Sequence, residues 1–212
     1  MQQITKEQLA SLEIVAKASA ERASETLSKL VGIPIKLTMA RVRIVETAEL
    51  AELVASPEKS VSAIFLPVTG GGKGSSVLIS SLEESHRLAE LITKQSKGSF
   101  AKLDDSAISI LKETANIIGG AFLSVLSNKT GISFIQSVPS HFIGTMQEVV
   151  GMAIARLEHK DSNLAVAFEI DFSLSATTTT TTTTTEEIIT HYIFLLEVAF
   201  AQKLFEALEK SR

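Results

Sequence analysis

The stretch AISILKETANIIGGAFLSVLS, residues 107–127, has the pattern of a single amphipathic helix with two unlike faces. Apolar side chains recur in it at steps of three and four residues, which predicts a stripe that packs on a core; they are Ile108, Leu111, Ala115, Ile118, Phe122 and Val125. Four other residues fall within roughly 60° of one another on the opposite side, at about 100° per residue; they are Ser109, Glu113, Asn116 and Gly120. We therefore expect a helix that buries one face and presents a carboxylate and an amide on the other, beside a glycine that admits a close partner.

The end of this helix repeats a segment found earlier in the chain. Leu126-Ser127-x-x-x-Gly131-Ile132 matches Leu27-Ser28-x-x-x-Gly32-Ile33, at a constant offset of 99 residues. Because a glycine just past a helix is a usual C-terminal signal, we expect long helices over about residues 5–30 and 105–129. A second match, at an offset of 116, relates Val77-Leu78-Ile79 and its following helix to Ile193-Phe194-Leu195. The chain therefore contains two versions of one unit.

Each unit has the same expected order: a long helix, a strand, two paired strands and a shorter helix. Thr38–Val45 and Leu164–Phe172 are rich in β-prone residues, and Gly70–Gly74 has the composition of a hairpin turn. These elements predict an α+β fold in which long helices pack on one face of an antiparallel sheet. The matched halves predict a tandem duplication with pseudo-twofold symmetry.

We expect one domain over residues 1–212, with internal repeats at about 5–98 and 104–212. The second match has the larger offset, so the second repeat carries extra residues, and these include the nine threonines Thr177–Thr185. Threonine favours extended backbone, but nine in a row have no apolar face to bury. We therefore expect residues 174–187 to form the exposed tip of a long hairpin.

Composition argues against several classes of protein. The net charge is −4 and the basic residues do not cluster, so the chain lacks the electrostatic footprint of a nucleic-acid-binding protein. Without cysteine it can form neither disulfides nor thiolate metal sites. No apolar run approaches about 20 residues, and the N-terminus lacks the pattern of a signal peptide. We expect a cytoplasmic protein that binds neither nucleic acid nor membrane.

Some patterns that resemble known sites fail on spacing. The glycine-rich run GGGKGSS, residues 70–76, has no Gly-Lys followed directly by Ser or Thr, so it is not a phosphate-binding loop. The four histidines, His86, His141, His159 and His191, are not spaced as metal ligands. We therefore expect this chain to hold no cofactor and no metal of its own.

The polar face of the 107–127 helix has two interpretations. Glu-x-x-Asn on a helix is usually only a solvated surface, because so short a motif is weak. However, Asn is unfavourable inside helices, and Gly119-Gly120 costs about 1 kcal/mol per glycine relative to alanine. Both choices are explained if this face must be flat and must present an amide. Gly119, at the side of that face, could equally serve close helix–helix packing.

The whole pattern resembles the signature of the CheC/CheX/FliY phosphatases of bacterial and archaeal chemotaxis. It comprises Glu113-x-x-Asn116-Ile117-Ile118-Gly119-Gly120-Ala121-Phe122-Leu123, with Ser109 four residues before the glutamate and Pro139 twenty-three after the asparagine. The resemblance extends over nearly the whole chain, since it includes the length and the tandem halves.

This resemblance implies a function. Members of the family hydrolyse the aspartyl phosphate of CheY, a response regulator that acts on the flagellar motor. The family's catalytic glutamate and asparagine correspond to Glu113 and Asn116, and its upstream polar residue to Ser109. The resemblance implies that Asn116 positions the attacking water, that Glu113 pairs with a lysine beside the partner's phosphorylation site, and that Ser109 adds a peripheral hydrogen bond. The phosphorylated receiver domain is the expected partner and would supply Mg²⁺.

The first repeat departs from the signature. At an offset of 99, Ala10, Ile14, Lys17 and Ala40 stand where the second repeat has Ser109, Glu113, Asn116 and Pro139. Lysine cannot accept a hydrogen bond from water. We therefore expect a single active site, in the second repeat. The alternative is an adaptor without catalysis, which binds and regulates the receptor deamidase CheD or a flagellar switch component.

Overall fold

The computed structural model describes residues 5–32, 34–53, 56–100, 102–157, 164–178 and 184–210. These residues form five α-helices, one 3-10 helix and seven β-strands. In chain order they are α1 (Lys6–Val31), β1 (Ile35–Glu46), η1 (Leu50–Leu53), β2 (Ser60–Gly70), β3 (Gly74–Ser81), α2 (Leu82–Thr93), α3 (Asp105–Thr130), β4 (Phe134–Gln136), β5 (Ser140–Thr145), α4 (Met146–Ile154), β6 (Leu164–Thr178), β7 (Thr184–Glu197) and α5 (Val198–Lys210).

Local signals in the sequence set the ends of the two long helices. α1 begins with a capping box in which Thr5 and Gln8 exchange hydrogen bonds, and α3 begins at the N-cap Asp104. Each ends at a glycine in the left-handed conformation, Gly32 with φ 73° and Gly131 with φ 68°. Glycine takes this conformation without the steric cost that a Cβ brings. The long helices predicted near 5–30 and 105–129 are confirmed.

The seven strands form one antiparallel sheet. Its order is β1-β6-β7-β3-β2-β4, and β5 also pairs with β2. The two hairpins, β2–β3 and β6–β7, lie side by side because β3 pairs with β7. The outer strands follow the two long helices: β1 follows α1, while β4 and β5 follow α3. The predicted α+β class with an antiparallel sheet is confirmed, while the repeat boundaries at 5–98 and 104–212 stay a prediction.

The outer edge made by β4 and β5 is interrupted at residues 137–139, opposite Pro67 of β2. Proline has no N–H to donate to a neighbouring strand, so a continuous ladder cannot run past it. The carbonyl of Pro67 still accepts a hydrogen bond from the N–H of Ser137, at 2.8 Å. The interruption separates β4 from β5 and carries Pro139, the distant proline of the sequence signature.

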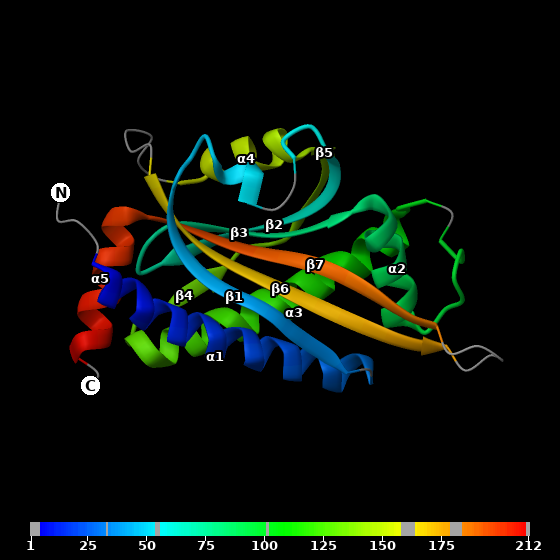
Figure 1. Ribbon diagram of the computed structural model, residues 1–212, viewed down its shortest axis with the longest axis horizontal. Coiled ribbons are helices and arrows are strands. Elements are labelled where there is room, and N and C mark those ends of the chain that lie inside the picture. Colours follow the sequence, from blue (N-terminus) through cyan, green and yellow to red (C-terminus); the bar gives the residue numbers. More distant parts are fainter. Residues whose placement is uncertain are drawn as a thin grey trace.

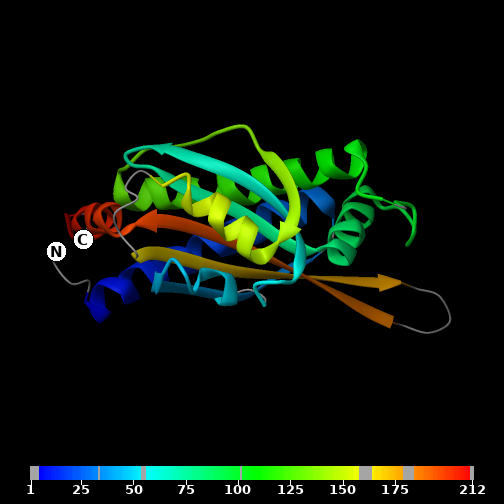
Figure 2. The same cartoon turned by 90° about the horizontal axis from the view of Figure 1, so that it is seen from above.

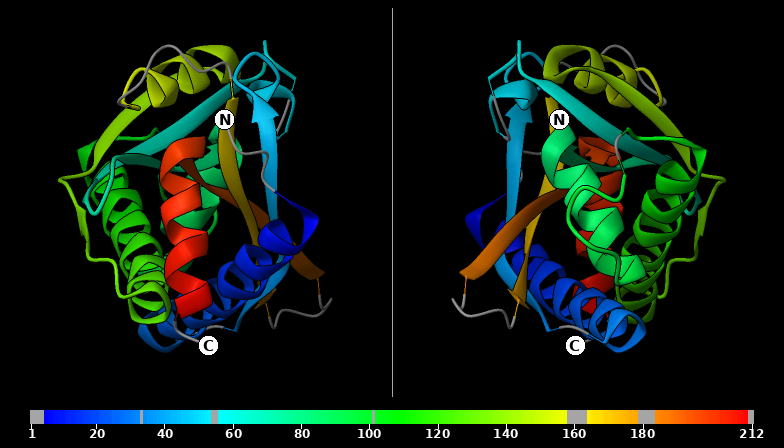
Figure 3. Two further views of the ribbon diagram at one scale, coloured as in Figure 1. Left: turned by 90° about the vertical axis from the view of Figure 1, so that its left-hand side faces the viewer. Right: turned by 90° about the vertical axis from the view of Figure 1, so that its right-hand side faces the viewer.

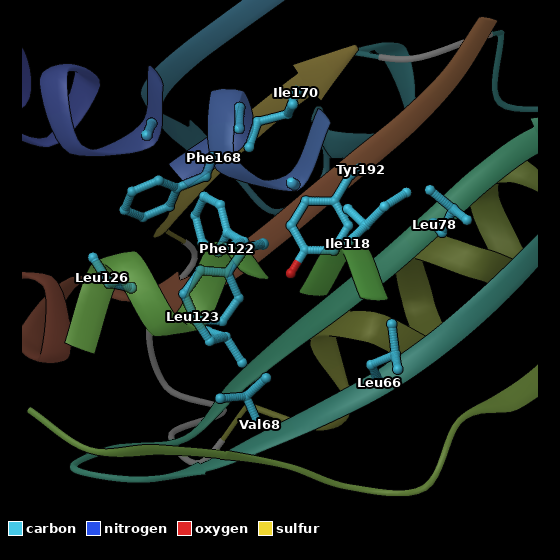
Figure 4. Close-up of a cluster of buried hydrophobic side chains, with 14 of the residues drawn as sticks. Leu66, Val68, Leu78, Ile118, Phe122, Leu123, Leu126, Phe168, Ile170 and Tyr192 are labelled. Atoms are coloured by element: carbon cyan, nitrogen blue, oxygen red, sulfur yellow. The ribbon is translucent and has the colours of Figure 1, made fainter. Parts of the chain in front are cut away.

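Four helices cover one face of the sheet. α1 and α3 run antiparallel along it, and α2 and α5 lie at opposite ends of this pair (Figures 1 and 3). The ring of Phe122 on α3 lies 5.7 Å from that of Phe168, 5.5 Å from that of Tyr192 and 5.6 Å from that of Phe194, between ring centroids. All four rings are fully buried, and Figure 4 shows three of them meeting between α3 and the sheet.

A second, smaller core lies on the opposite face of the sheet, under α4 and η1 (Figure 3). Val149 and Ala153 of α4 pack there with Ile79 of β3 and Ile193 of β7. Sequence analysis placed helices on one face only and did not predict α4. Nine residues are too few for periodicity to separate a helix from a strand. The sequence signal that could have located α4 is the capping box formed by Thr145 and Glu148 at its N-terminus.

The β6–β7 hairpin extends past the rest of the sheet (Figures 1 and 2). Its register pairs Thr177 with Thr185 and Thr178 with Thr184, so both strands continue into the threonine tract. The centre of the predicted tip, residues 179–183, lies outside the described residues.

Among the described residues, α3 is the one helix long and apolar enough to suit a membrane by length and composition, with a mean hydropathy of 1.2. A core helix passes the same test, and the apolar side of α3 packs on α1 and the sheet.

A buried carboxylate joins α2 to the loop that follows it. Glu90 is 1% exposed; its Oε2 lies 2.5 Å from Nη1 of Arg87, and its Oε1 accepts hydrogen bonds from the N–H groups of Gly98 and Phe100. Burial by itself raises the pKa of Glu90. The hydrogen bonds from Arg87 and the two N–H groups outweigh burial and lower this pKa below its ordinary value of 4.5.

The lowered pKa predicts a contribution of Glu90 to stability that depends on pH. It is present above pH 4.5, where the carboxyl is ionised folded or unfolded, and is lost as pH falls through the folded-state pKa. Glu90→Gln should lower the free energy of unfolding at pH 7 and lose less stability between pH 5 and pH 3 than the wild type. Urea unfolding across this range measures both effects. Glu83→Gln, at an exposed position of α2, is the matched control; identical pH profiles for wild type and Glu90→Gln would contradict the prediction.

Candidate functional site

The outward face of α3 carries the residues singled out from the sequence. Ser109, Glu113 and Gly120 are exposed and Asn116 is half-buried, while Phe122 on the other side is fully buried. The expected two faces of this helix are therefore confirmed. We call the four outward residues the α3 ridge. Their catalytic role stays a prediction.

A side chain from the neighbouring strand holds the amide of Asn116. Gln136, on β4, donates from Nε2 to Oδ1 of Asn116 at 2.7 Å, and the same nitrogen lies 3.4 Å from the backbone carbonyl oxygen of Asn116. Since Asn116 has no other side-chain hydrogen bond among the described residues, its Nδ2 is left for a ligand. Sequence analysis missed Gln136, because no motif spacing relates it to Asn116.

The adjacent glycines of α3 have different surroundings. A Cβ at Gly119 would lie 2.3 Å from Oε1 of Gln136, whereas a Cβ at Gly120 would meet no atom within 4 Å. Gly119 therefore makes room for the Gln136 side chain, and not for another helix. Gly120 leaves the surface beside Asn116 open, as expected of a site that a partner approaches closely.

The carboxylate of Glu113 and the imidazole of His141 differ in their contacts. Within the described part of the chain, the exposed carboxylate of Glu113 has no salt-bridge partner, so it is available to an external cation. His141 of β5 lies 3.0 Å from Oγ of Ser62, through its Nε2. Burial, and then the positive charge of Lys112, lowers the pKa of His141, so the ring stays neutral near pH 7. This histidine therefore adds no positive charge to the β5 edge of the sheet.

Three exposed apolar side chains lie at separate points along the β4–β5 edge of the sheet. Ile135 of β4 is 63% exposed, Val138 of the β4–β5 connection 87%, and Ile143 of β5 47%. They make up half of the large hydrophobic residues that are exposed in the described structure. They do not form one patch, because Ile135 pairs with Thr69 and Ile143 with Ser62, seven residues apart along β2 and on opposite faces of the sheet.

The counterparts of the ridge in the first half are also on the surface. Ala10, Ile14 and Lys17 of α1 are all exposed, and Ile14 is 67% exposed. Ala40 of β1, the counterpart of Pro139, is half-buried. This surface presents neither a carboxylate nor an amide at the matched positions.

The described residues contain no group of three or more His, Asp or Glu side chains that could hold a metal ion. The α3 ridge instead offers one free carboxylate, one oriented amide and one hydroxyl on the outward face of a helix. Such a set can pair with a cation and hold a water molecule, but it contains no nucleophile activated by a neighbouring base. It therefore suits a reaction in which the other reactant is already activated.

Comparison with known proteins agrees with this geometry. The family model described as "CheC-like family" matches residues 107–143, which run from α3 to β5. The CheY-P phosphatase CheC of Bacillus subtilis is 22% identical over 210 residues, which cover 98% of this chain and 97% of that protein.

Solved structures share the fold at low sequence identity. FliY of Thermotoga maritima superposes with a TM-score of 0.73 at 17% identity, over 100% of both chains. CheX in a CheX–CheY–BeF3–Mg²⁺ complex from Borrelia burgdorferi superposes with a TM-score of 0.53 at 17% identity, over 85% of this chain and 97% of that chain.

Alanine should change the free energy of unfolding differently at Gly119 and at Gly120, because the two positions have different neighbours. Gly120→Ala should raise the free energy of unfolding by about 0.5–1 kcal/mol, because alanine favours a helix interior and meets open space. Gly119→Ala should gain less or lose stability, because Gln136 must move away and release Asn116. Urea unfolding of both variants measures the difference. An equal gain at the two positions would show that Gln136 does not occupy the space beside Gly119.

Proposed function

Because the chain belongs to the CheC-like family of chemotaxis proteins, we propose that it hydrolyses the aspartyl phosphate of a CheY-type response regulator. The observation that carries this proposal is the pairing on the α3 ridge of an unpartnered carboxylate, Glu113, with an amide held in place, Asn116. Both lie on the outward face of α3, which suits a substrate that is a folded protein and not a small molecule in a pocket.

The chemistry needs little from this chain. An aspartyl phosphate is an acyl phosphate, so a water molecule held in line with the phosphorus is enough for attack. Asn116 binds and orients that water. The oxygen of the water forms a bond to phosphorus while the bond from phosphorus to the aspartyl oxygen breaks. This releases phosphate and restores the aspartate. The water's protons pass to the phosphate and the solvent.

The other ridge residues orient the partner. Glu113 pairs with a lysine beside the partner's phosphorylated aspartate, and Ser109 adds a hydrogen bond at the edge of the contact. The partner's own Mg²⁺ neutralises the phosphoryl oxygens, so this chain needs no metal. The complex of CheX with CheY, BeF3 and Mg²⁺ supports such an encounter for a protein of this fold.

The surroundings of the ridge support docking of a whole domain. Gly120 adds no side chain that would hold a partner away from Asn116. Response regulators act in the cytoplasm, and we place this protein there too.

A non-catalytic adaptor is the second candidate. It is favoured by the α1 surface, where Ile14 is 67% exposed and no catalytic side chain stands at the matched positions. A protein that binds CheD or a flagellar switch component through α1 needs no ridge. The retained Glu113 and Asn116 favour the phosphatase, because a scaffold has no use for that pair.

The decisive experiment follows loss of phosphate from a purified CheY-type receiver domain, with and without this protein. The wild type should accelerate dephosphorylation, and Asn116→Ala should reduce the acceleration about 100-fold, because the attacking water is no longer positioned. Glu113→Ala should mainly weaken binding of the phosphorylated receiver, and Ser109→Ala should have a smaller effect.

Lys17→Ala is the matched control, since Lys17 is the exposed counterpart of Asn116 on α1. It should leave the rate unchanged. Equal rates for wild type and Asn116→Ala would remove the mechanism. No acceleration by the wild type, together with tight capture of CheD, would favour the adaptor.

A further inference from the structure

Within the part of the chain that the structure describes, Gln136 is the one side chain hydrogen-bonded to the amide of Asn116, the proposed water-positioning group. Its Nε2 reaches Oδ1 of Asn116 at 2.7 Å, from a strand that lies 20 residues further along the chain. The contact joins the sheet edge to the middle of the ridge. A half-buried asparagine on a helix surface otherwise has free rotation about two side-chain bonds.

The fold sets the position of Gln136 from three sides. Its backbone pairs with Val68 of β2, and the next residue, Ser137, donates its N–H to the carbonyl of Pro67. On the helix side, Gly119 leaves the space that the Gln136 amide occupies, since a Cβ there would lie 2.3 Å from Oε1. Backbone pairing and the missing Cβ therefore direct this side chain to Asn116.

The contact also fixes which atom of Asn116 faces outward. Nε2 of Gln136 lies 3.4 Å from the backbone carbonyl oxygen of Asn116, which can only accept a hydrogen bond. The glutamine nitrogen therefore faces Asn116, and its oxygen lies beside Gly119. As a result Oδ1 of Asn116 turns to Gln136, and both hydrogens of Nδ2 are left for a ligand.

This orientation leaves Oε1 of Gln136 buried without a hydrogen-bond partner in the described structure. An unsatisfied buried acceptor costs about 1–3 kcal/mol. A residue selected only to tie β4 to α3 would avoid this cost, since an apolar side chain fills the same space. The arrangement is accounted for if its purpose is to orient Asn116.

We propose that Gln136 is a positioning residue for the reaction, which holds the Asn116 amide so that Nδ2 and one free lone pair of Oδ1 face the attacking water. The inference rests on the proposed phosphatase function. Gln136 itself does not touch the phosphoryl group. It acts through Asn116, and its loss lets the amide rotate away from the productive orientation, where a displacement of about 1 Å costs on the order of 100-fold in rate.

The test compares the wild type with Gln136→Met and Gln136→Glu, in the full chain. Methionine keeps the length and apolar packing but cannot donate. Gln136→Met should lower kcat for the phosphorylated receiver domain about 10- to 100-fold and leave KM within about twofold. The side-chain amide resonances of Asn116, followed by NMR without any partner, should shift and lose their fixed orientation. Gln147→Met, at an exposed glutamine of α4, is the matched control and should change neither kcat nor those resonances.

Gln136→Glu adds a readout that a structural role would not move. An ionised glutamate can only accept a hydrogen bond, so Asn116 must reverse its amide and turn Nδ2 inward. Protonation of the glutamate restores a donor. The Asn116 amide resonances of this variant should therefore titrate with a carboxyl pKa, whereas those of the wild type and of Gln147→Met should not.

The outcomes separate the two proposals. If the wild type accelerates dephosphorylation while Gln136→Met keeps kcat within twofold and the Asn116 resonances stay in place, the role of Gln136 is overturned and the phosphatase stands. A fall in thermal stability with kcat unchanged likewise overturns it, because Gln136 would then only tie β4 to α3. If the wild type has no activity, the phosphatase fails, and a positioning role fails with it even where the resonances move.

Discussion

The packing of Phe122 among Phe168, Tyr192 and Phe194 holds α3 at one rotation about its axis, and the proposed functional surface depends on it. Residues on a helix are separated by about 100°, so a shift of one position would turn Glu113 from solvent to the side of the helix. A carboxylate forced toward an apolar core without a partner is strongly unfavourable. The same rotation of α3 therefore buries the aromatic cluster and exposes the ridge.

The sheet edge contributes the second part of the site. Pro67 lacks the N–H that a continuous neighbouring strand requires, and the chain opposite it divides into β4 and β5. The short β4 ends with Gln136 next to α3, and the connection that follows bears Val138 and Pro139. A proline in a central strand therefore helps to shape a surface on the neighbouring strand. Helix periodicity alone places the Glu113 carboxylate on the surface, whereas fixing the Asn116 amide requires both α3 and β4.

The asymmetry between the halves has a simple structural basis. α1 and α3 pack side by side, and each has an outward face, so both could present a ridge (Figure 3). Only α3 carries Glu113 and Asn116, while α1 has Ile14 and Lys17 at the matched positions. The first helix retains the packing stripe because the fold requires it. Its outward face is free to change, since no core contact depends on those side chains.

Much of this molecule could be inferred from local pattern. Periodicity identified the buried and outward faces of α3, and glycines located the ends of both long helices. α4 was not predicted, because nine residues are too few to give a clear helical period. Gly119 remained ambiguous between packing partners, and the structure shows that it faces a strand side chain rather than a helix.

The sequence by itself determined which side chains α3 turns outward, because helix geometry converts spacing directly into direction. Only the tertiary structure decided that Gln136 meets Asn116 and that both faces of the sheet are covered. These depend on the register of β4 against β2 and on the height at which α3 crosses the sheet. Contacts of that kind join residues that no local rule of spacing relates, so they emerge only when all the layers pack together.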